Sequence, residues 1–221
     1  SVSESIIRPI KYENGCLDMT RLVFKWSVTN NVKYFTFSST SAVYGESQNI
    51  PLSEELDESP MSPYAKYKLL SEKYLNIFSE NLDCQVSVMR FFNVFGEEQP
   101  SHGSYAPAVA KFMNQFESGN PITVTGDGLQ TRDYVYVGDV VKALILTLNK
   151  KYHYNIFNVG SGIESRIIDI AKQFNDNIVF IEERKEPKRS CANINKIKMV
   201  LEWEPTTTIF DWIRKLPNQL I

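Results

Sequence analysis

The sequence predicts an α/β fold built on a parallel sheet. Short runs rich in aromatic and β-branched residues alternate along the 221 residues with longer segments whose apolar residues recur at helical spacing. Polar residues gather directly after several of the short runs, where the predicted strands end. Open parallel α/β sheets bind ligands outside the carboxyl ends of their strands, so we expect the functional site there.

The first part of the chain contains two predicted helices and two predicted strands. Apolar positions at helical spacing, including Leu17, Leu22 and Trp26, indicate a helix over residues 12–29. The aromatic run KYFTFSS predicts a strand, and a loop rich in Pro, Ser and Glu then extends to Pro63. A second helix is expected over residues 64–80, followed by a buried strand in the segment CQVSVMRF.

Beyond Gly96 the predicted elements are shorter. A loop through residue 103 leads to a helix near 106–117 and a strand at 122–125. Alternation in YVYV indicates a strand, GDVVKALILTL indicates a helix, and YNIFNVGSG indicates a strand that ends in a glycine turn. A helix near 165–174, a strand at 178–181 and two short C-terminal helical segments complete the prediction.

Composition excludes several classes of function. The chain is 43% hydrophobic, enough for a sizeable core, and its net charge of -2 gives no basic field for nucleic acid or anionic membranes. The three cysteines, Cys16, Cys84 and Cys191, lack C-x2-C spacing and favour a reducing compartment. His102 and His153 lack metal-ligand spacing, so no metal site is expected. No apolar run approaches the ~20 residues of a membrane helix and no signal-peptide pattern opens the chain, which predicts a cytoplasmic protein.

The segment SPYAKYK places Tyr64 and Lys68 on one face of a predicted helix. A tyrosine with an ordinary pKa of about 10 is a poor base, and lowering that pKa by ~3 units needs ~4 kcal/mol. Lys68 would therefore need help from a bound cationic cofactor ring or from desolvation. A hydroxyl such as Thr40 would then share the proton path. The alternative is an ordinary surface pair, because about one Tyr-x3-basic match is expected by chance.

Five segments together resemble the extended short-chain dehydrogenase/reductases that act on nucleotide sugars. SSTSAVYG, SPYAKYK, RFFNVFG, GDGLQTRDYVYVGDVVKA and FNVGSG occur in the order and spacing of that family, over residues 1 to about 205. The resemblance implies an incomplete Rossmann-type doubly wound parallel sheet with a small C-terminal α/β substrate-binding region. Residues 1–103 would be the C-terminal part of the NAD-binding domain and 104–221 mainly the substrate-binding region, with 126–160 contributing elements back to the sheet.

The resemblance also implies catalytic and cofactor-binding residues. Thr40 occupies the position of the catalytic Ser/Thr and Tyr64 that of the general acid/base. Lys68 would bind the nicotinamide ribose and lower the pKa of the tyrosine. Ser38 and Ser39 join Tyr64 and Lys68 as expected contacts of NAD. Without the resemblance, this serine cluster would be an ordinary polar strand end.

A second set of residues is implied to bind the sugar nucleotide. Asn93 matches the asparagine that contacts the diphosphate, and Arg132 matches the arginine that grips its phosphates, a role that suits a guanidinium fork. Ser41 is a further expected substrate contact. Arg184 is the candidate for the second phosphate arginine, although EERKEPKRS departs from the usual Arg-x-Gly-Asp/Glu spacing. The alternatives are that Asn93 is a turn former and Arg132 a surface ion-pair residue.

The residues after the catalytic hydroxyl bear on the type of reaction. Dehydratases of the family carry Asp-Glu at this place, because removing water from the sugar needs an extra acid and base, and decarboxylating members keep a Glu. This chain has Ser41-Ala42 instead, and neither side chain can carry out the proton transfer of an elimination. The resemblance therefore favours 4-epimerisation of a UDP-sugar through a 4-keto intermediate. A nucleotide-sugar reductase or dehydratase of the same family is an alternative.

The glycine fingerprint of the family, Gly-x2-Gly-x2-Gly or a close variant, does not occur in the sequence. We therefore expect that the chain begins after the βαβ unit that holds most of NAD. It would be either the C-terminal part of an active epimerase or a non-catalytic remnant that binds a sugar nucleotide. Alone, with the edge of KYFTFS open, it is expected to be aggregation-prone and to bind NAD weakly. The family commonly dimerises through the helices at 12–29 and 64–80, which implies a homodimer.

Overall fold

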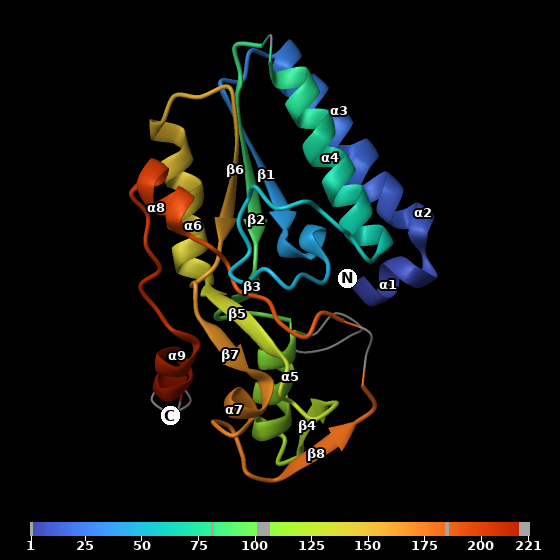
Figure 1. Cartoon of the computed structure of the whole chain (residues 1–221), viewed down its shortest axis with the longest axis vertical. Helices are drawn as coiled ribbons and strands as arrows, with labels where there is room; N and C mark the ends of the chain where they lie inside the picture. The colour runs from blue at the N-terminus through green and yellow to red at the C-terminus, as the bar shows by residue number, and fades with distance from the viewer. Residues whose placement is uncertain (1, 81, 101–106, 184–185, 217–221) are drawn as a thin grey trace.

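A three-stranded parallel sheet forms the centre of the molecule (Figure 1). The computed structural model describes residues 2–80, 82–100, 107–183 and 186–216. The strands lie in the order β1-β2-β6 and all run the same way, with their carboxyl ends directed toward the lower part of the molecule in Figure 1. Their bounds are β1 Tyr34–Thr40, β2 Gln85–Phe91 and β6 Tyr154–Val159. The predicted parallel α/β sheet is confirmed.

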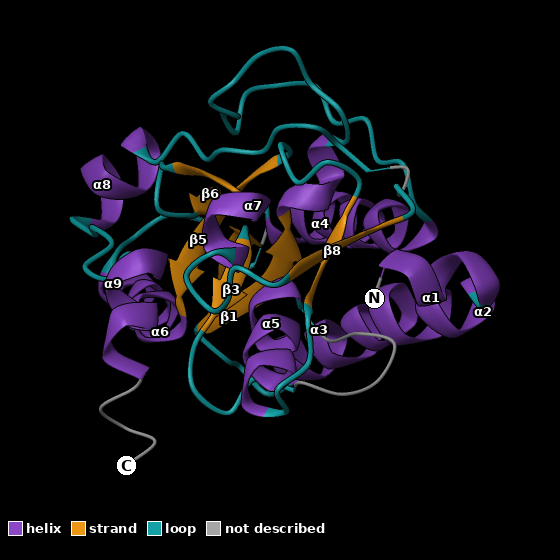
Figure 2. Ribbon diagram, turned by 90° about the horizontal axis from the view of Figure 1, so that it is seen from below, coloured by secondary structure: helices purple, strands orange, loops and turns teal. Residues whose placement is uncertain are grey.

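Helices cover both faces of this sheet (Figure 2). One layer contains α3 and α4, whose apolar side chains pack with those of β1 and β2 around Phe24, Leu75 and Val88. The other layer contains α6 and α8, which close a second core around Met89, Phe157 and Trp203. The bounds of these helices are α3 Met19–Thr29, α4 Pro63–Ser79, α6 Val137–Leu146 and α8 Asn195–Leu201.

The predicted helix over residues 12–29 is confirmed, and it is part of a longer helical segment. After α1 (Val2–Ile7), helix α2 (Pro9–Tyr12) leads into a π-helical turn, η1 (Glu13–Asp18), and then into α3. The carbonyl of Cys16 in η1 accepts hydrogen bonds from the hydroxyls of Thr20 at 2.5 Å and Ser71 at 3.1 Å. Because Ser71 belongs to α4, the π-helical turn is fastened to that helix.

The predicted helix over residues 64–80 corresponds to α4, which begins one residue earlier. Pro63 occupies the first turn, where its missing N–H is not needed, and the Ser62 hydroxyl accepts a hydrogen bond from the Ala65 N–H at 3.2 Å. This capped start fixes the first turn of the helix, which carries Tyr64.

A second α/β region lies below the carboxyl ends of the central strands in Figure 1. It contains a sheet in the order β3-β5-β7 and a parallel pair, β4 and β8. Its apolar core includes Phe95, Ile122, Tyr134 and Trp212. The strands are β3 Asn93–Phe95, β5 Thr131–Tyr136, β7 Glu164–Arg166, β4 Ile122–Thr125 and β8 Ile178–Ile181, and the helices are α5 Ala108–Glu117, α7 Ile167–Ala171 and α9 Ile209–Lys215.

Two predictions for this region need correction. The helix predicted near 165–174 is shorter, because residues 164–166 form β7, which pairs antiparallel with β5, and α7 ends at Ala171. The strands β3 and β7 were not predicted at all, since each has three residues and shows no alternation. Residues 101–103 of the predicted loop and residue 106 of the helix predicted near 106–117 lie outside the described residues.

The predicted domain boundary between residues 103 and 104 stays a prediction, although the two regions differ in their sheets and apolar cores.

Among the described residues no helix is both long and apolar enough to cross a membrane.

Candidate functional site

Lys68 lies beside the carboxyl end of β1. Its ammonium donates a hydrogen bond to the Ser38 carbonyl at 2.7 Å and lies 4.7 Å from the centre of the Phe37 ring, at cation–π distance. Burial lowers the pKa of Lys68, and the charges of Cys16 and Glu72 oppose that change. The helix thus carries its cation directly to the strand end where the sequence predicts chemistry.

Tyr64 lies one helical turn before Lys68 and is half-buried. Its ring meets the edge of the Tyr12 ring, with centroids 6.1 Å apart and an interplanar angle of 86°. The Tyr12 hydroxyl in turn donates to the Glu4 carboxylate at 3.0 Å. The N-terminal helices therefore hold one side of Tyr64 through an aromatic contact.

The hydroxyl-bearing residues at the end of β1 differ in how far they are exposed to solvent. Ser38 is exposed and Thr40 half-buried, whereas Ser39 is 4% exposed and its hydroxyl donates to the Glu72 carboxylate. The Thr40 Oγ1 accepts the Ala42 N–H at 3.2 Å and so caps the short 3₁₀ helix η2 (Ser41–Tyr44). A cofactor contact of Ser39, as predicted, would therefore have to use its main chain.

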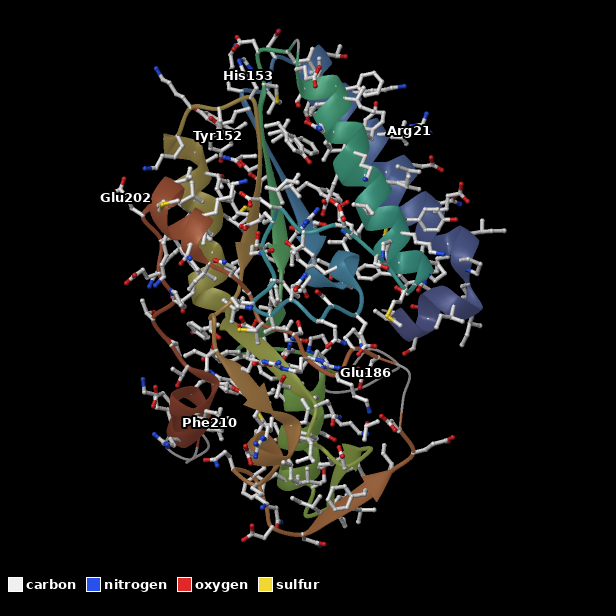
Figure 3. The ribbon with its side chains drawn as sticks, in the orientation of Figure 1. Arg21, Tyr152, His153, Glu186, Glu202 and Phe210 are labelled. Carbon is white, nitrogen blue, oxygen red and sulfur yellow. The ribbon has the colours of Figure 1, made fainter. Side chains whose placement is uncertain are left out.

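Asn93 and Arg132 lie on neighbouring strands, β3 and β5. The Asn93 side-chain amide donates to the Asp133 carbonyl at 2.9 Å, directly beside Arg132. Arg132 donates to its neighbour Thr131 at 2.8 Å and forms an ion pair of 3.0 Å with Glu186, whose place on the molecule is labelled in Figure 3. A guanidinium that holds a carboxylate in this way can equally hold phosphate oxygens.

Arg184, the other predicted phosphate ligand, lies outside the described residues. Ser41 is half-buried at the first position of η2. The structure thus joins Ser38 to Lys68 and links Asn93 to the main chain of Asp133, the residue after Arg132. The roles assigned to these residues stay predictions.

Asp133 is a site-supporting residue that the sequence did not reveal. Its carboxylate is fully buried and accepts four hydrogen bonds, from the Ser161 N–H at 2.6 Å, the Ser161 hydroxyl at 2.7 Å, and the Gly162 and Ala192 N–H groups at 2.9 Å each. Burial raises the pKa of Asp133 and these donors oppose the change. The side chain fastens the glycine turn after β6 next to Arg132.

Glu72 and Arg90 were also missed, and each had a signal in the sequence. Glu72 continues the four-residue spacing of Tyr64 and Lys68, and Arg90 is a charged residue within an apolar predicted strand. Both are buried in the structure, with 1% and 0% of their surface exposed. Among the residues described, no group of three or more His, Cys, Asp or Glu side chains is arranged to hold a metal ion.

A sequence profile of the NAD dependent epimerase/dehydratase family matches residues 1–160 of this chain. A curated relative, an uncharacterized UDP-glucose epimerase of Bacillus subtilis, is 30% identical over 194 residues. The alignment covers 82% of this chain and 58% of that relative, so the chain spans less than two thirds of its length.

Two solved structures resemble the whole described fold. The UDP-glucose 4-epimerase of Thermotoga maritima, solved with UDP-glucose, has a TM-score of 0.93 and 29% identity, covering 100% of this chain and 75% of its own. The UDP-N-acetylglucosamine 4-epimerase of Methanobrevibacter ruminantium, in complex with UDP-N-acetylmuramic acid, has a TM-score of 0.91 and 32% identity, covering 99% and 74%. Both place the central sheet among Rossmann-fold epimerases.

Proposed function

This chain belongs to the NAD dependent epimerase/dehydratase family, and we propose that it catalyses the 4-epimerisation of a UDP-sugar. One observation carries the proposal: the Lys68 ammonium is anchored 2.7 Å from the Ser38 carbonyl, two residues before Thr40, with Tyr64 one turn away on the same helix. A phenol, an ammonium and a hydroxyl at the carboxyl end of a parallel strand suit proton transfer at a sugar hydroxyl. The names of the relatives support a UDP-sugar as substrate.

In this proposal Tyr64 removes the proton of the sugar 4-hydroxyl and later returns it. Thr40 donates a hydrogen bond to the same oxygen, and the Lys68 ammonium stabilises the phenolate of Tyr64. A bound nicotinamide would supply the chemistry of accepting hydride from C4 of the sugar and returning it. Because the 4-keto sugar turns over between these two transfers, C4 of the sugar would regain its hydrogen on the opposite face, which inverts its configuration.

The residues of this chain fit one end of NAD. An ammonium has three donors, and Lys68 uses one on Ser38, which leaves capacity for the hydroxyls of the nicotinamide ribose. The exposed side chain of Ser38 adjoins this position. The glycine turn that would hold the pyrophosphate is not among these 221 residues. The fit therefore concerns the nicotinamide end alone.

The diphosphate of the substrate is assigned to Arg132 and Asn93. Arg132 is 13% exposed in its side chain and already pairs with a carboxylate, so a phosphate would replace Glu186 as its partner. We retain Ser41 as a contact of the sugar and Arg184 as a second phosphate ligand. Elimination is disfavoured because Ser41 and Ala42 offer no carboxylate beside Thr40.

We also propose that the protein forms a homodimer through the outer sides of α3 and α4, which lie side by side (Figure 1). Large apolar side chains are exposed there, with Leu22 at 64%, Trp26 at 63% and Ile77 at 66%. Such a surface is unusual on a monomer. Changing Trp26 to Glu should yield monomers in size-exclusion chromatography with light scattering, whereas Met199→Glu on α8, exposed at 77%, should not. Equal masses for wild type and Trp26→Glu would contradict this interface.

A cytoplasmic location is part of the same proposal. It is supported by three buried cysteines that form no disulfide.

The epimerase proposal is tested with the gene product expressed from its natural start codon. Conversion of UDP-glucose, UDP-galactose and their N-acetylated forms is followed by chromatography, with Tyr64→Phe as the test variant. Loss of the phenol proton should lower kcat by about a hundredfold or more. The matched control is Tyr67→Phe, whose hydroxyl contacts Glu13 at 3.3 Å instead.

Other products would identify the alternatives. A 4-keto-6-deoxy sugar would indicate a dehydratase, and consumption of reduced nicotinamide with a single product would indicate a reductase. Binding of UDP-sugar in calorimetry without any turnover would favour the non-catalytic alternative and overturn the proposed activity.

A further inference from the structure

A row of buried polar residues crosses the central sheet one position before Thr40. In the strand register Ser39 pairs with Arg90, and Arg90 pairs with Asn158. The three residues are 4%, 0% and 0% exposed. Neighbouring positions on adjacent strands point to the same face of a sheet, so these side chains form one continuous polar layer.

Glu72 of α4 accepts hydrogen bonds from two members of this row. Arg90 donates through Nη2 at 2.7 Å and through Nε at 3.2 Å, and the Ser39 hydroxyl is the third donor. Glu72 lies four residues after Lys68 and eight after Tyr64, so all three share one side of the helix. The carboxylate therefore connects the helix face that bears Tyr64 and Lys68 to both β1 and β2.

Arg90 has two further contacts, with Glu58 and Tyr44. Its Nη2 reaches Glu58 at 2.9 Å, and its guanidinium lies 4.8 Å from the centre of the Tyr44 ring. Burial raises the pKa of Tyr44 to about 12, so the phenol stays neutral and donates to Asn158 at 2.7 Å. Among the described residues the buried Arg90 Nη1 has no hydrogen-bond partner.

The buried ion pair of Glu72 and Arg90 fixes the geometry of the elements that it joins. Buried ion pairs contribute little net stability compared with apolar residues of the same volume, but they fix geometry strongly. Two links meet at the end of β1, where Lys68 donates to the Ser38 carbonyl and Ser39 donates to Glu72. Thr40 follows directly. The helix and the strand that supply the three candidate catalytic groups are thus tied together at adjacent residues.

We propose that Glu72 and Arg90 are a positioning pair, which sets the Tyr64 and Lys68 face of α4 against Thr40 at the end of β1. The role rests on the proposed epimerase function. Neither residue touches the reacting atoms, and both act through Ser39 and through the helix.

Glu72 also acts on Lys68 through its charge. The groups that face Lys68 are Cys16 from η1, Tyr64 and Glu72 from its own helix, and the uncharged Phe37 and Ser38 from β1. Burial lowers the pKa of Lys68, and the charges of Cys16 and Glu72 oppose this. Removing the charge of Glu72 should lower the pKa of Lys68 further.

The first test replaces both charges by apolar residues of similar size, Glu72→Leu with Arg90→Met. Because such replacements often preserve stability, the melting temperature should stay within about 5 °C of wild type. If the pair positions the site, kcat for the UDP-sugar should fall about tenfold or more while KM changes by less than about twofold. The control is Lys33→Met with Asp83→Leu, an exposed ion pair just before β1 and β2. A folded double variant with wild-type kcat overturns the proposal.

The second test needs neither cofactor nor turnover and also applies if the double variant does not fold. The pKa of Lys68 is measured in the cofactor-free protein by NMR of ¹³C-methylated lysines, with Lys68→Met identifying the signal. Glu72→Gln should lower this pKa, and an unchanged value overturns the electrostatic part of the role. If wild-type protein converts no UDP-sugar, the proposed function fails, whereas the Lys68 titration still decides whether Glu72 acts on Lys68.

Discussion

Replacing Asp133 with asparagine should destabilise the protein strongly, although the two side chains have nearly the same shape. The carboxylate accepts two hydrogen bonds at each oxygen: Oδ1 from Ser161, and Oδ2 from the N–H groups of Gly162 and Ala192. An amide can accept at its single oxygen, and its least costly orientation places the NH₂ group against Ser161, whose hydroxyl can turn to accept a hydrogen bond from it. The Ser161 N–H would then lose its partner.

The magnitude follows from that one donor. An unsatisfied group of this kind costs about 1–3 kcal/mol, so the free energy of unfolding should fall by about 2 kcal/mol. For a chain of this size that corresponds to a loss of roughly 6 °C in melting temperature. Thermal and urea unfolding monitored by circular dichroism measure both quantities. Asp176→Asn, at an exposed position, is the control. If Asp133→Asn melts within about 2 °C of that control, the carboxylate does not hold the turn as described.

Three further predictions concern the core, acid stability and the substrate. Leu75→Ala, at a fully buried position in α4, should cost about 2–5 kcal/mol in urea unfolding, and a cost below about 1 kcal/mol would contradict the described packing. Burial alone would raise the pKa of Glu58, but the Arg90 guanidinium outweighs burial and leaves the pKa lowered. Ionised Glu58 therefore stabilises the folded protein at pH values above its unfolded pKa. This stabilisation is lost as the pH falls through the folded pKa. Glu58→Gln should therefore be less stable than wild type by about 1 kcal/mol at pH 7 and by less near pH 3, and an equal deficit at both pH values would refute the linkage. Glu186→Gln should tighten UDP-sugar binding up to about fivefold in calorimetry by freeing Arg132, and weaker binding would show that Glu186 assists the substrate instead.

The sequence predicted most of the fold because its elements carry strong local patterns. Apolar residues at helical spacing identified α4, and short aromatic or β-branched runs identified β1, β2 and β6. The three-residue strands β3 and β7 escaped, because a strand that short is defined by its partner β5 and not by its own residues. The π-helical turn at Glu13–Asp18 has no local signature either.

The candidate site was predictable where residues lie close together in sequence. Tyr64 and Lys68 are one turn apart, so the helix alone brings them together. The contacts of Lys68 with Ser38, and of Asn93 with the strand that carries Arg132, depend on strand order. Asp133 could not be recognised, since its four hydrogen bonds come from three residues in two distant segments. These residues join only through tertiary packing, which a local pattern does not encode.

The polar row formed by Ser39, Arg90 and Asn158 also favours one register of the central strands over the others. Side chains alternate between the two faces of a strand, so a shift of β2 by one residue against β1 would carry Arg90 to the face covered by α6 and α8. There its charge would meet an apolar core that includes Phe157 and Trp203, and it would lose its ion pair with Glu72. The purely apolar residues of β2 would tolerate such a slip far better, because apolar neighbours on both faces accept them. A single arginine thus makes misaligned pairings costly, and selects the pairing that brings the end of β1, with Thr40, to the helix that carries Lys68.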